Sequence, residues 1–186
     1  GLKKDLAKAG NEKRFAKDKK FWDDQLDALG EPLYSDIQGP SVLEEARKRH
    51  GNPKLRSSDI EMKDLFVAVK DYYLEPGPTK NLIDFCMNHQ LSMTNLLLLG
   101  IRTYLSKVNN GQEDITIQNF ISRRSTHDEW TSGGSRTIMF PCRTVITPET
   151  DFLSAAYEIQ NMQNRIYMHS NYDPAFIMDE MRKRYN

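Results

Sequence analysis

Apolar positions recur with a helical period in the first part of the chain. Residues 2–29 predict a helical segment that Gly10-Asn11 interrupts, because apolar side chains recur between Lys and Asp at spacings compatible with one helix face. These side chains are Phe15, Phe21, Trp22, Leu26 and Leu29. Residues 30–56 are rich in Pro and Gly and predict a long connection. Within it, the pattern predicts a short helix over 41–50 with Ser41 as its N-cap.

The middle of the chain mixes extended and helical patterns. Residues 57–70 alternate in part and favour extended chain or two short strands. Pro76-Gly77-Pro78 predicts a break, followed by a helix of about ten residues that Thr79 caps. Ser92 is expected to cap a second helix, Met93–Lys107, which is apolar on nearly all sides. Such a helix is expected in the middle of a sandwich.

The last third alternates strands and helices. Residues 113–121 and 137–147 alternate apolar and polar positions and predict two strands joined by a polar loop. Pro141 within the second strand indicates a sheet edge or a bulge. Helices are predicted from 148 to about 169 and over 175–184. The order predicts an α/β fold with helices packed against a mixed sheet.

Composition narrows the class of protein. The chain has 186 residues with 26 basic and 26 acidic side chains, and a zero net charge argues against a nucleic-acid binder that relies on bulk electrostatics. Its longest apolar run, 96–99, is far too short to cross a membrane. Cys86 and Cys142 lie within apolar patterns and are expected to be buried free thiols of a cytoplasmic protein. Gly1 and the sequence after it lead us to expect a piece cut from a longer polypeptide.

The residue types alone give no active site. The four histidines are scattered, and the chain has no phosphate-binding loop, dinucleotide fingerprint or nucleophile elbow. Cys86 and His89 lie one helical turn apart, but a zinc site needs two further ligands, and none is near in sequence, so we expect no bound metal.

Three segments, in order and spacing, resemble the condensation domains of nonribosomal peptide synthetases. The first is 15–26, where an aromatic residue and Trp22 precede Leu26 as in the family's W-x-x-x-L. The second runs from Arg124 to Arg143 and is similar to the family's N-R-S-T strand end and its G-x-F-V-N-T-x-P-x-R segment. The third is 167–174, which looks like the family's His/Asn-Gln-Asp-Tyr-Pro segment.

The resemblance implies a lobe of the chloramphenicol acetyltransferase-like fold. Such domains have two αβα lobes that meet at a tunnel, and the catalytic H-H-x-x-x-D-G motif lies in the first. Because this sequence lacks that motif, residues 1–186 are expected to be a single C-terminal lobe without activity of its own. Its implied partners are the N-terminal lobe and carrier proteins with phosphopantetheine arms, and no cofactor is expected to bind the lobe directly.

The resemblance also names site residues, with tunnel-lining or structural roles. Arg124 and Arg143 are expected to anchor the sheet and its loops by charged hydrogen bonds, or else to form surface salt bridges. Gly134 would permit close backbone approach. Ile138 stands where the family has Asn, and it either faces the tunnel or packs within the strand. His169 lies in the third segment, where Ser170-Asn171 replaces the family's Gln-Asp.

Two other functions fit the same resemblance. One is a non-catalytic module that docks carrier proteins or other synthetase domains, and the other is a coenzyme-A-dependent acyltransferase of the same superfamily. An isolated lobe is further expected to expose an apolar face and to self-associate as a homodimer.

Overall fold

The structure is a computed structural model that describes residues 10–56, 67–124 and 126–185. The chain divides into two compact units. Unit 1 comprises residues 1–32, 116–143 and 161–186, and unit 2 comprises residues 33–115 and 144–160.

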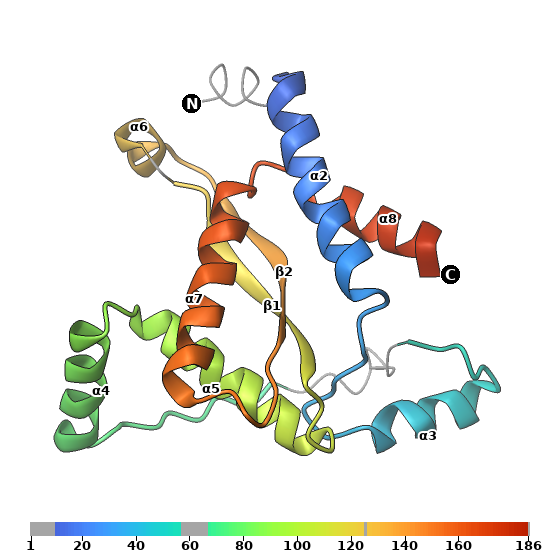
Figure 1. Cartoon of the computed structure of the whole chain (residues 1–186), viewed down its shortest axis with the longest axis horizontal. Helices are drawn as coiled ribbons and strands as arrows, with labels where there is room; N and C mark the ends of the chain where they lie inside the picture. Colours follow the sequence, from blue (N-terminus) through green and yellow to red (C-terminus); the bar gives the residue numbers. More distant parts are fainter. Residues whose placement is uncertain (1–9, 57–66, 125, 186) are drawn as a thin grey trace. The chain divides into compact units, whose positions relative to one another are not determined.

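Unit 1 contains the helices nearest to the N-terminus and the C-terminus in the described part of the chain (Figure 1). Helix α2 spans Glu12–Leu29. The Asn11 side chain accepts a hydrogen bond from the Arg14 amide and caps its start, and Gly30, with a φ of 64°, ends it. Helix α8 spans Pro174–Tyr185, with proline in the first turn as expected. Helix α7, Phe152–Met168, contributes its C-terminal half to this unit.

The sheet in the described part of the chain has two strands, β1 (Asp114–Ser122) and β2 (Thr137–Val145). The Arg123 amide donates to the Arg136 carbonyl at one end, and the Ile146 amide donates to the Glu113 carbonyl at the other. Both bonds belong to one antiparallel register. The connection contains a short helix, α6 (His127–Thr131), so the prediction of a plain polar loop there was incomplete.

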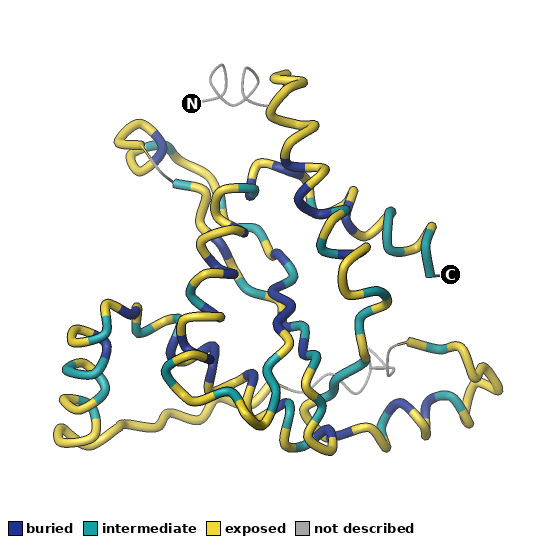
Figure 2. The backbone as a smooth tube through the Cα atoms, in the orientation of Figure 1, coloured by how far each residue is buried: buried dark blue, intermediate teal, exposed yellow. Residues whose placement is uncertain are grey.

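The two faces of this sheet differ in burial. One face carries Ile121 and Phe140, both buried, and the Phe140 ring stacks on Trp22 of α2 with centroids 5.5 Å apart. The other face carries Phe120 and Met139, which the register places directly opposite one another and which remain 66% and 43% exposed. The sheet therefore has one face packed on helices and one with an exposed apolar pair. Figure 2 shows buried and exposed positions alternating along the two strands.

Unit 2 contains α3 (Ser41–His50), α4 (Pro76–Asn88), α5 (Met93–Val108) and the first half of α7. The Arg102 guanidinium is buried and donates to the carbonyls of Glu113 and Ile146. Burial lowers the pKa of this guanidinium. Arg102 thus ties α5 to residues that flank the two strands.

Several local predictions for unit 2 need correction. Helix α3 forms, but Pro40 is its N-cap, and Ser41 is its first helical residue. Helix α4 begins at Pro76 rather than after Pro78, because proline fits a first turn; Glu75 is its N-cap, and the Thr79 hydroxyl donates to the Glu75 carbonyl. The Ser92 cap of α5 is confirmed.

Two further predictions concern extended and buried segments. Residues 57–66 lie outside the described residues, and 67–70 form no strand and are exposed. Helix α5 is not buried all round, since Leu97, Ile101 and Tyr104 are each more than half exposed. These three residues lie along one side of the helix, which we call the α5 stripe.

The general character of the chain agrees with expectation. The α/β class is confirmed, and Cys86 and Cys142 are buried free thiols. In the described ranges, no helix is long and apolar enough to span a membrane.

Candidate functional site

The clearest polar pair in unit 1 joins helix α2 to the residue that follows α7. His169 Nδ1 lies 2.8 Å from Asp18 Oδ1. The two side chains are only 12% and 4% exposed. Because a carboxylate oxygen only accepts, Nδ1 carries the proton, and Nε2 is left without a partner among the described residues. The pair therefore fixes the orientation of the imidazole ring.

Aromatic packing holds this imidazole in place. The His169 ring stacks on Phe21, with centroids 4.2 Å apart and an interplanar angle of 10°. The Trp22 indole donates to the His169 carbonyl at 3.4 Å. The Arg165 guanidinium also lies over the Phe21 ring, at 5.2 Å. His169 is thus positioned by the same helix face that packs on β2 through Trp22.

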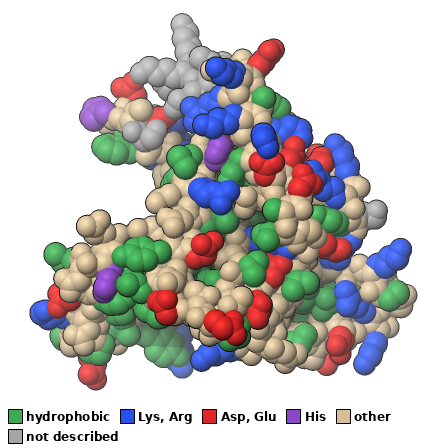
Figure 3. Space-filling model, in the orientation of Figure 1, with side chains coloured by type: hydrophobic (Ala, Val, Ile, Leu, Met, Phe, Trp, Pro, Cys, Tyr) green, Lys and Arg blue, Asp and Glu red, His purple; other side chains and the backbone are tan. Residues whose placement is uncertain are grey.

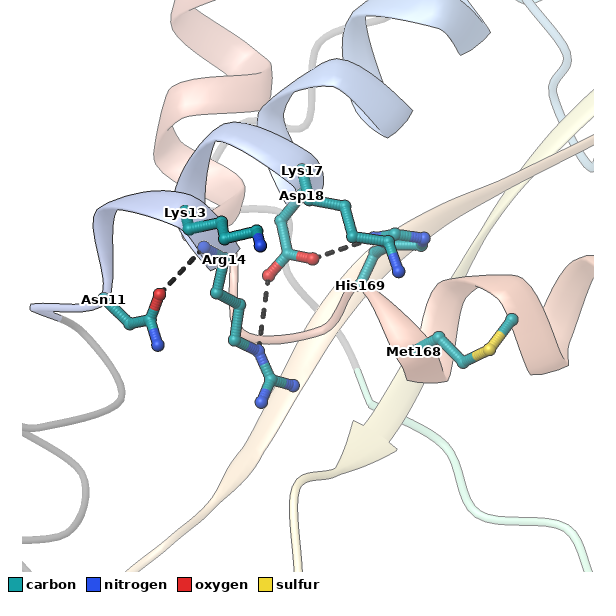
Figure 4. Close-up of a pocket in the computed structure, with 7 residues that line it drawn as sticks. All are labelled: Asn11, Lys13, Arg14, Lys17, Asp18, Met168 and His169. Carbon is teal, nitrogen blue, oxygen red and sulfur yellow. Dashed lines mark hydrogen bonds and ion pairs between the residues drawn. The ribbon is translucent and has the colours of Figure 1, made fainter.

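A cavity of about 340 Å³ opens beside the pair (Figure 4). The start of α2 and the end of α7 supply its lining, which consists of Asn11, Lys13, Arg14, Lys17, Asp18, Met168 and His169. Arg14 Nε lies 3.9 Å from Asp18 Oδ2, so the two carboxylate oxygens face an imidazole and a guanidinium. The cavity is rich in cationic groups and has one carboxylate.

Asp18 is the site residue that sequence reasoning missed. It lies 151 positions from His169, and no local motif links the two. A signal was present, because Asp18 precedes Trp22 by one helical turn and therefore shares the apolar face of α2. An acidic residue on a buried helix face needs a polar partner, although the pattern does not say which one.

Arg143 is directed at the end of α2. Its guanidinium donates to the carbonyls of Gly30 at 2.7 Å, Leu29 at 2.9 Å and Glu31 at 3.3 Å. The side chain is buried in β2. A cation at the C-terminus of a helix satisfies its free carbonyls and complements its dipole. Arg143 therefore fixes the end of α2 against the strand.

Arg124 organises the connection between β1 and β2. Its guanidinium donates to the carbonyls of Glu129, Ser132 and Gly134. The Trp130 indole donates back to the Arg124 carbonyl at 3.0 Å. These contacts, with the capping box that Thr126 and Glu129 form on α6, give the loop a defined conformation.

Gly134 lies shortly before β2, and Ile138 is the second residue of that strand. Gly134 has a φ of 86°, and an added Cβ would meet nothing within 4 Å, so within this chain its requirement is backbone conformation rather than close approach. Ile138 is half-buried, and the register places it opposite Ile121 on the face packed on helices. This placement is typical of strand packing, and a position in a tunnel stays a prediction.

The predicted site residues thus fall into separate groups. Arg124 and Gly134 share one loop, Arg143 holds the end of α2, and His169 pairs with Asp18 near the start of that helix. Contact of any of them with substrate remains a prediction. Across residues 10–56, 67–124 and 126–185, no group of three His, Cys, Asp or Glu side chains could hold a metal ion.

Comparison with known proteins gives a family and a relative that this chain is similar to. The family model described as the condensation domain matches residues 4–186. A plipastatin synthase polypeptide of Bacillus subtilis (strain 168) is 22% identical over 170 residues, which cover 91% of this chain and 6% of that protein.

Solved structures show the fold. The first condensation domain of the calcium-dependent antibiotic synthetase, in complex with a substrate analogue, aligns with a TM-score of 0.71 at 15% identity. That alignment covers 95% of this chain and 36% of the solved one. A second structure of the same domain gives a TM-score of 0.71 at 14% identity and covers 34% of the solved chain. The chain thus spans about a third of the length of the structures it matches.

Proposed function

The chain belongs to the condensation domain family, and on that premise we propose that it forms the C-terminal lobe of a condensation domain in a nonribosomal peptide synthetase. The observation that carries the proposal is the share of a condensation domain that this chain spans. The family matches residues 4–186, whereas the chain spans only 36% of a matched condensation domain structure. The sequence also lacks the H-H-x-x-x-D-G motif that the resemblance places in the N-terminal lobe.

The whole domain would form an amide from a thioester, or an ester where the acceptor is a hydroxyl. The acceptor amine attacks the thioester carbonyl of the donor, the C–N bond forms, and the C–S bond breaks to release a thiol. A histidine of the N-terminal lobe would take the proton that the amine loses and pass it to the departing sulfur. Donor and acceptor arrive on phosphopantetheine arms of carrier proteins, in a cytoplasmic assembly. The two buried free thiols of this chain support that reducing location.

Within this reaction the lobe would supply a rigid wall. The guanidinium groups of Arg124 and Arg143 donate hydrogen bonds to backbone carbonyls. Arg124 thereby holds the β1–β2 connection in a fixed position, and Arg143 holds the end of α2. Alignment of two bound reactants depends on such fixed elements.

The role of Ile138 can be tested in the complete domain, where the Ile138→Asn substitution restores the family residue. A change in turnover or substrate choice would place Ile138 in the tunnel, and lost stability with unchanged kinetics would place it in the core.

The exposure of the α5 stripe supports the proposal that a partner covers this helix in the complete domain. Leu97, Ile101 and Tyr104 are 56%, 53% and 53% exposed along one side of a helix. Exposed apolar surface of this kind marks an interface. The proposed occupant is the N-terminal lobe, and in its absence a second copy of the chain would cover the stripe.

Sedimentation tests the assignment. We expect the chain alone, at tens of micromolar, to self-associate and to bind an apolar dye. When a lobe that carries H-H-x-x-x-D-G is added, a one-to-one complex should form, and both self-association and dye binding should be lost. Leu97→Glu should weaken that complex, and Met87→Glu on α4 is the matched control, since Met87 is 73% exposed outside the stripe. A monomer without dye binding, or no complex with the added lobe, would contradict the proposal.

A further inference from the structure

We infer that the cavity beside Asp18 and His169 binds the dianionic phosphate group of a small ligand. The inference rests on the lining of this cavity and does not depend on the proposed function. The ligand would be held by Lys13, Arg14 and Lys17 on the first turns of α2, and the His169 imidazole is part of the same lining.

The charges in the lining favour a dianion. Lys13, Arg14 and Lys17 carry three positive charges, and Asp18 carries one negative charge. Asp18 is 4% exposed and faces Arg14 and the Nδ1 proton of His169, so its charge is already matched within the protein. The remaining excess of positive charge suits a phosphate monoester or hydrogen phosphate at neutral pH better than a carboxylate.

Two of the cationic groups in the cavity also have donors that are not used. In the described part of the chain, the ammonium groups of Lys13 and Lys17 have no ion-pair partner. Neighbouring lysines on the same helix differ, since Lys19 pairs with Asp23 at 2.5 Å and Lys20 pairs with Asp24 at 2.7 Å. Figure 3 shows basic side chains gathered over this part of α2, next to a histidine.

The cavity has the size and walls for a small phosphorylated molecule. About 340 Å³ lies at the lower end of the range for small-molecule pockets. The Asn11 Oδ1 caps the Arg14 amide, which leaves the Asn11 amide NH₂ as a further donor at the rim. Met168 gives an apolar wall for the carbon part of an ester.

Titration calorimetry tests the inference with the full 186-residue chain in phosphate-free buffer with 150 mM sodium chloride, a salt concentration that screens diffuse surface charge. The probes are inorganic phosphate, glycerol 3-phosphate and acetate. We expect saturable binding of phosphate or its ester, with acetate at least about tenfold weaker. Tighter binding of the ester identifies a phosphorylated organic ligand, and equal binding identifies free phosphate.

Matched variants locate the site. Lys17→Gln and Lys13→Gln should each weaken binding about tenfold, because each removes a charge-assisted hydrogen bond. Lys20→Gln removes the same charge from the same helix outside the cavity, and should change affinity less than about twofold. Urea unfolding of each variant checks that the fold is kept. Absence of saturable binding, acetate binding as tight as phosphate, or an equal loss in Lys20→Gln would overturn the inference.

Discussion

Unit 1 contains two sets of positively charged side chains that differ in what surrounds them. One set is hydrogen-bonded to the backbone, and the other lines a cavity. Arg124 and Arg143 direct their guanidinium groups at three backbone carbonyls each. Lys13 and Lys17 line a cavity and have no ion-pair partner in the described part of the chain. The difference teaches that the arginines fix the backbone, whereas the lysines remain available to a ligand. Stability should therefore respond to the first set and binding to the second.

The largest effect is expected at Arg143. Arg143→Met removes a buried cation and leaves three carbonyls at the end of α2 without their donor, so the free energy of unfolding should fall by about 3 kcal/mol. Urea unfolding measures this. Arg182→Met is the control, because Arg182 is exposed and pairs with the exposed Asp179, and the change should cost less than about 1 kcal/mol. Equal costs would remove the distinction between the two sets.

Asp18→Asn should have the next largest effect. The change leaves His169 without its carboxylate and should lower the free energy of unfolding by about 2 kcal/mol. Imidazole nitrogen NMR should also show a mixture of tautomers, with the proton on Nδ1 in some molecules and on Nε2 in others. Asp24→Asn on the exposed side of α2 serves as the control. An unchanged imidazole spectrum in Asp18→Asn would argue that the pair does not form.

Arg124→Met should act locally. Its guanidinium is half-buried, and loss of its bonds to the loop carbonyls should cost about 1 kcal/mol. Hydrogen exchange should accelerate at the amides of Glu129 and Trp130, which belong to α6, and stay unchanged in α5. Faster exchange throughout both elements would mean that Arg124 supports the whole fold rather than one loop.

The smallest effect on stability is expected at Lys17. Lys17→Gln removes a cation with no ion-pair partner among the described residues, so its unfolding free energy should stay within about 0.5 kcal/mol of the starting chain. A loss as large as that of Arg124→Met, in the same urea experiment, would show that Lys17 also has a structural role.

The sequence predicted elements better than contacts. Helix α5 and its Ser92 cap follow from a local pattern of apolar residues and one hydroxyl, and both were predicted. The exposure of the α5 stripe was not, because periodicity shows that Leu97 is apolar and not whether another element covers it. The start of α4 was misplaced, because Pro76 and Pro78 signal a break and also fit a first turn.

The site depended on contacts between distant segments. His169 was singled out by resemblance, but its partner Asp18 lies 151 residues away and was found only in the structure. The carbonyls that Arg143 meets belong to Leu29, Gly30 and Glu31, more than 110 positions earlier. Backbone acceptors carry no sequence signal, so such a contact cannot be predicted from residue types.

The assay for amide formation tests the central claim most directly. The chain is mixed with a donor-loaded and an acceptor-loaded carrier protein, with and without a separately expressed lobe that carries H-H-x-x-x-D-G, and product is followed by mass spectrometry. We predict no product above the enzyme-free control for the chain alone. Product should appear on addition of the lobe and fall about 100-fold or more when the second histidine of its motif is replaced by alanine. Product from the chain alone, abolished by replacing one of its own histidines, would contradict the account.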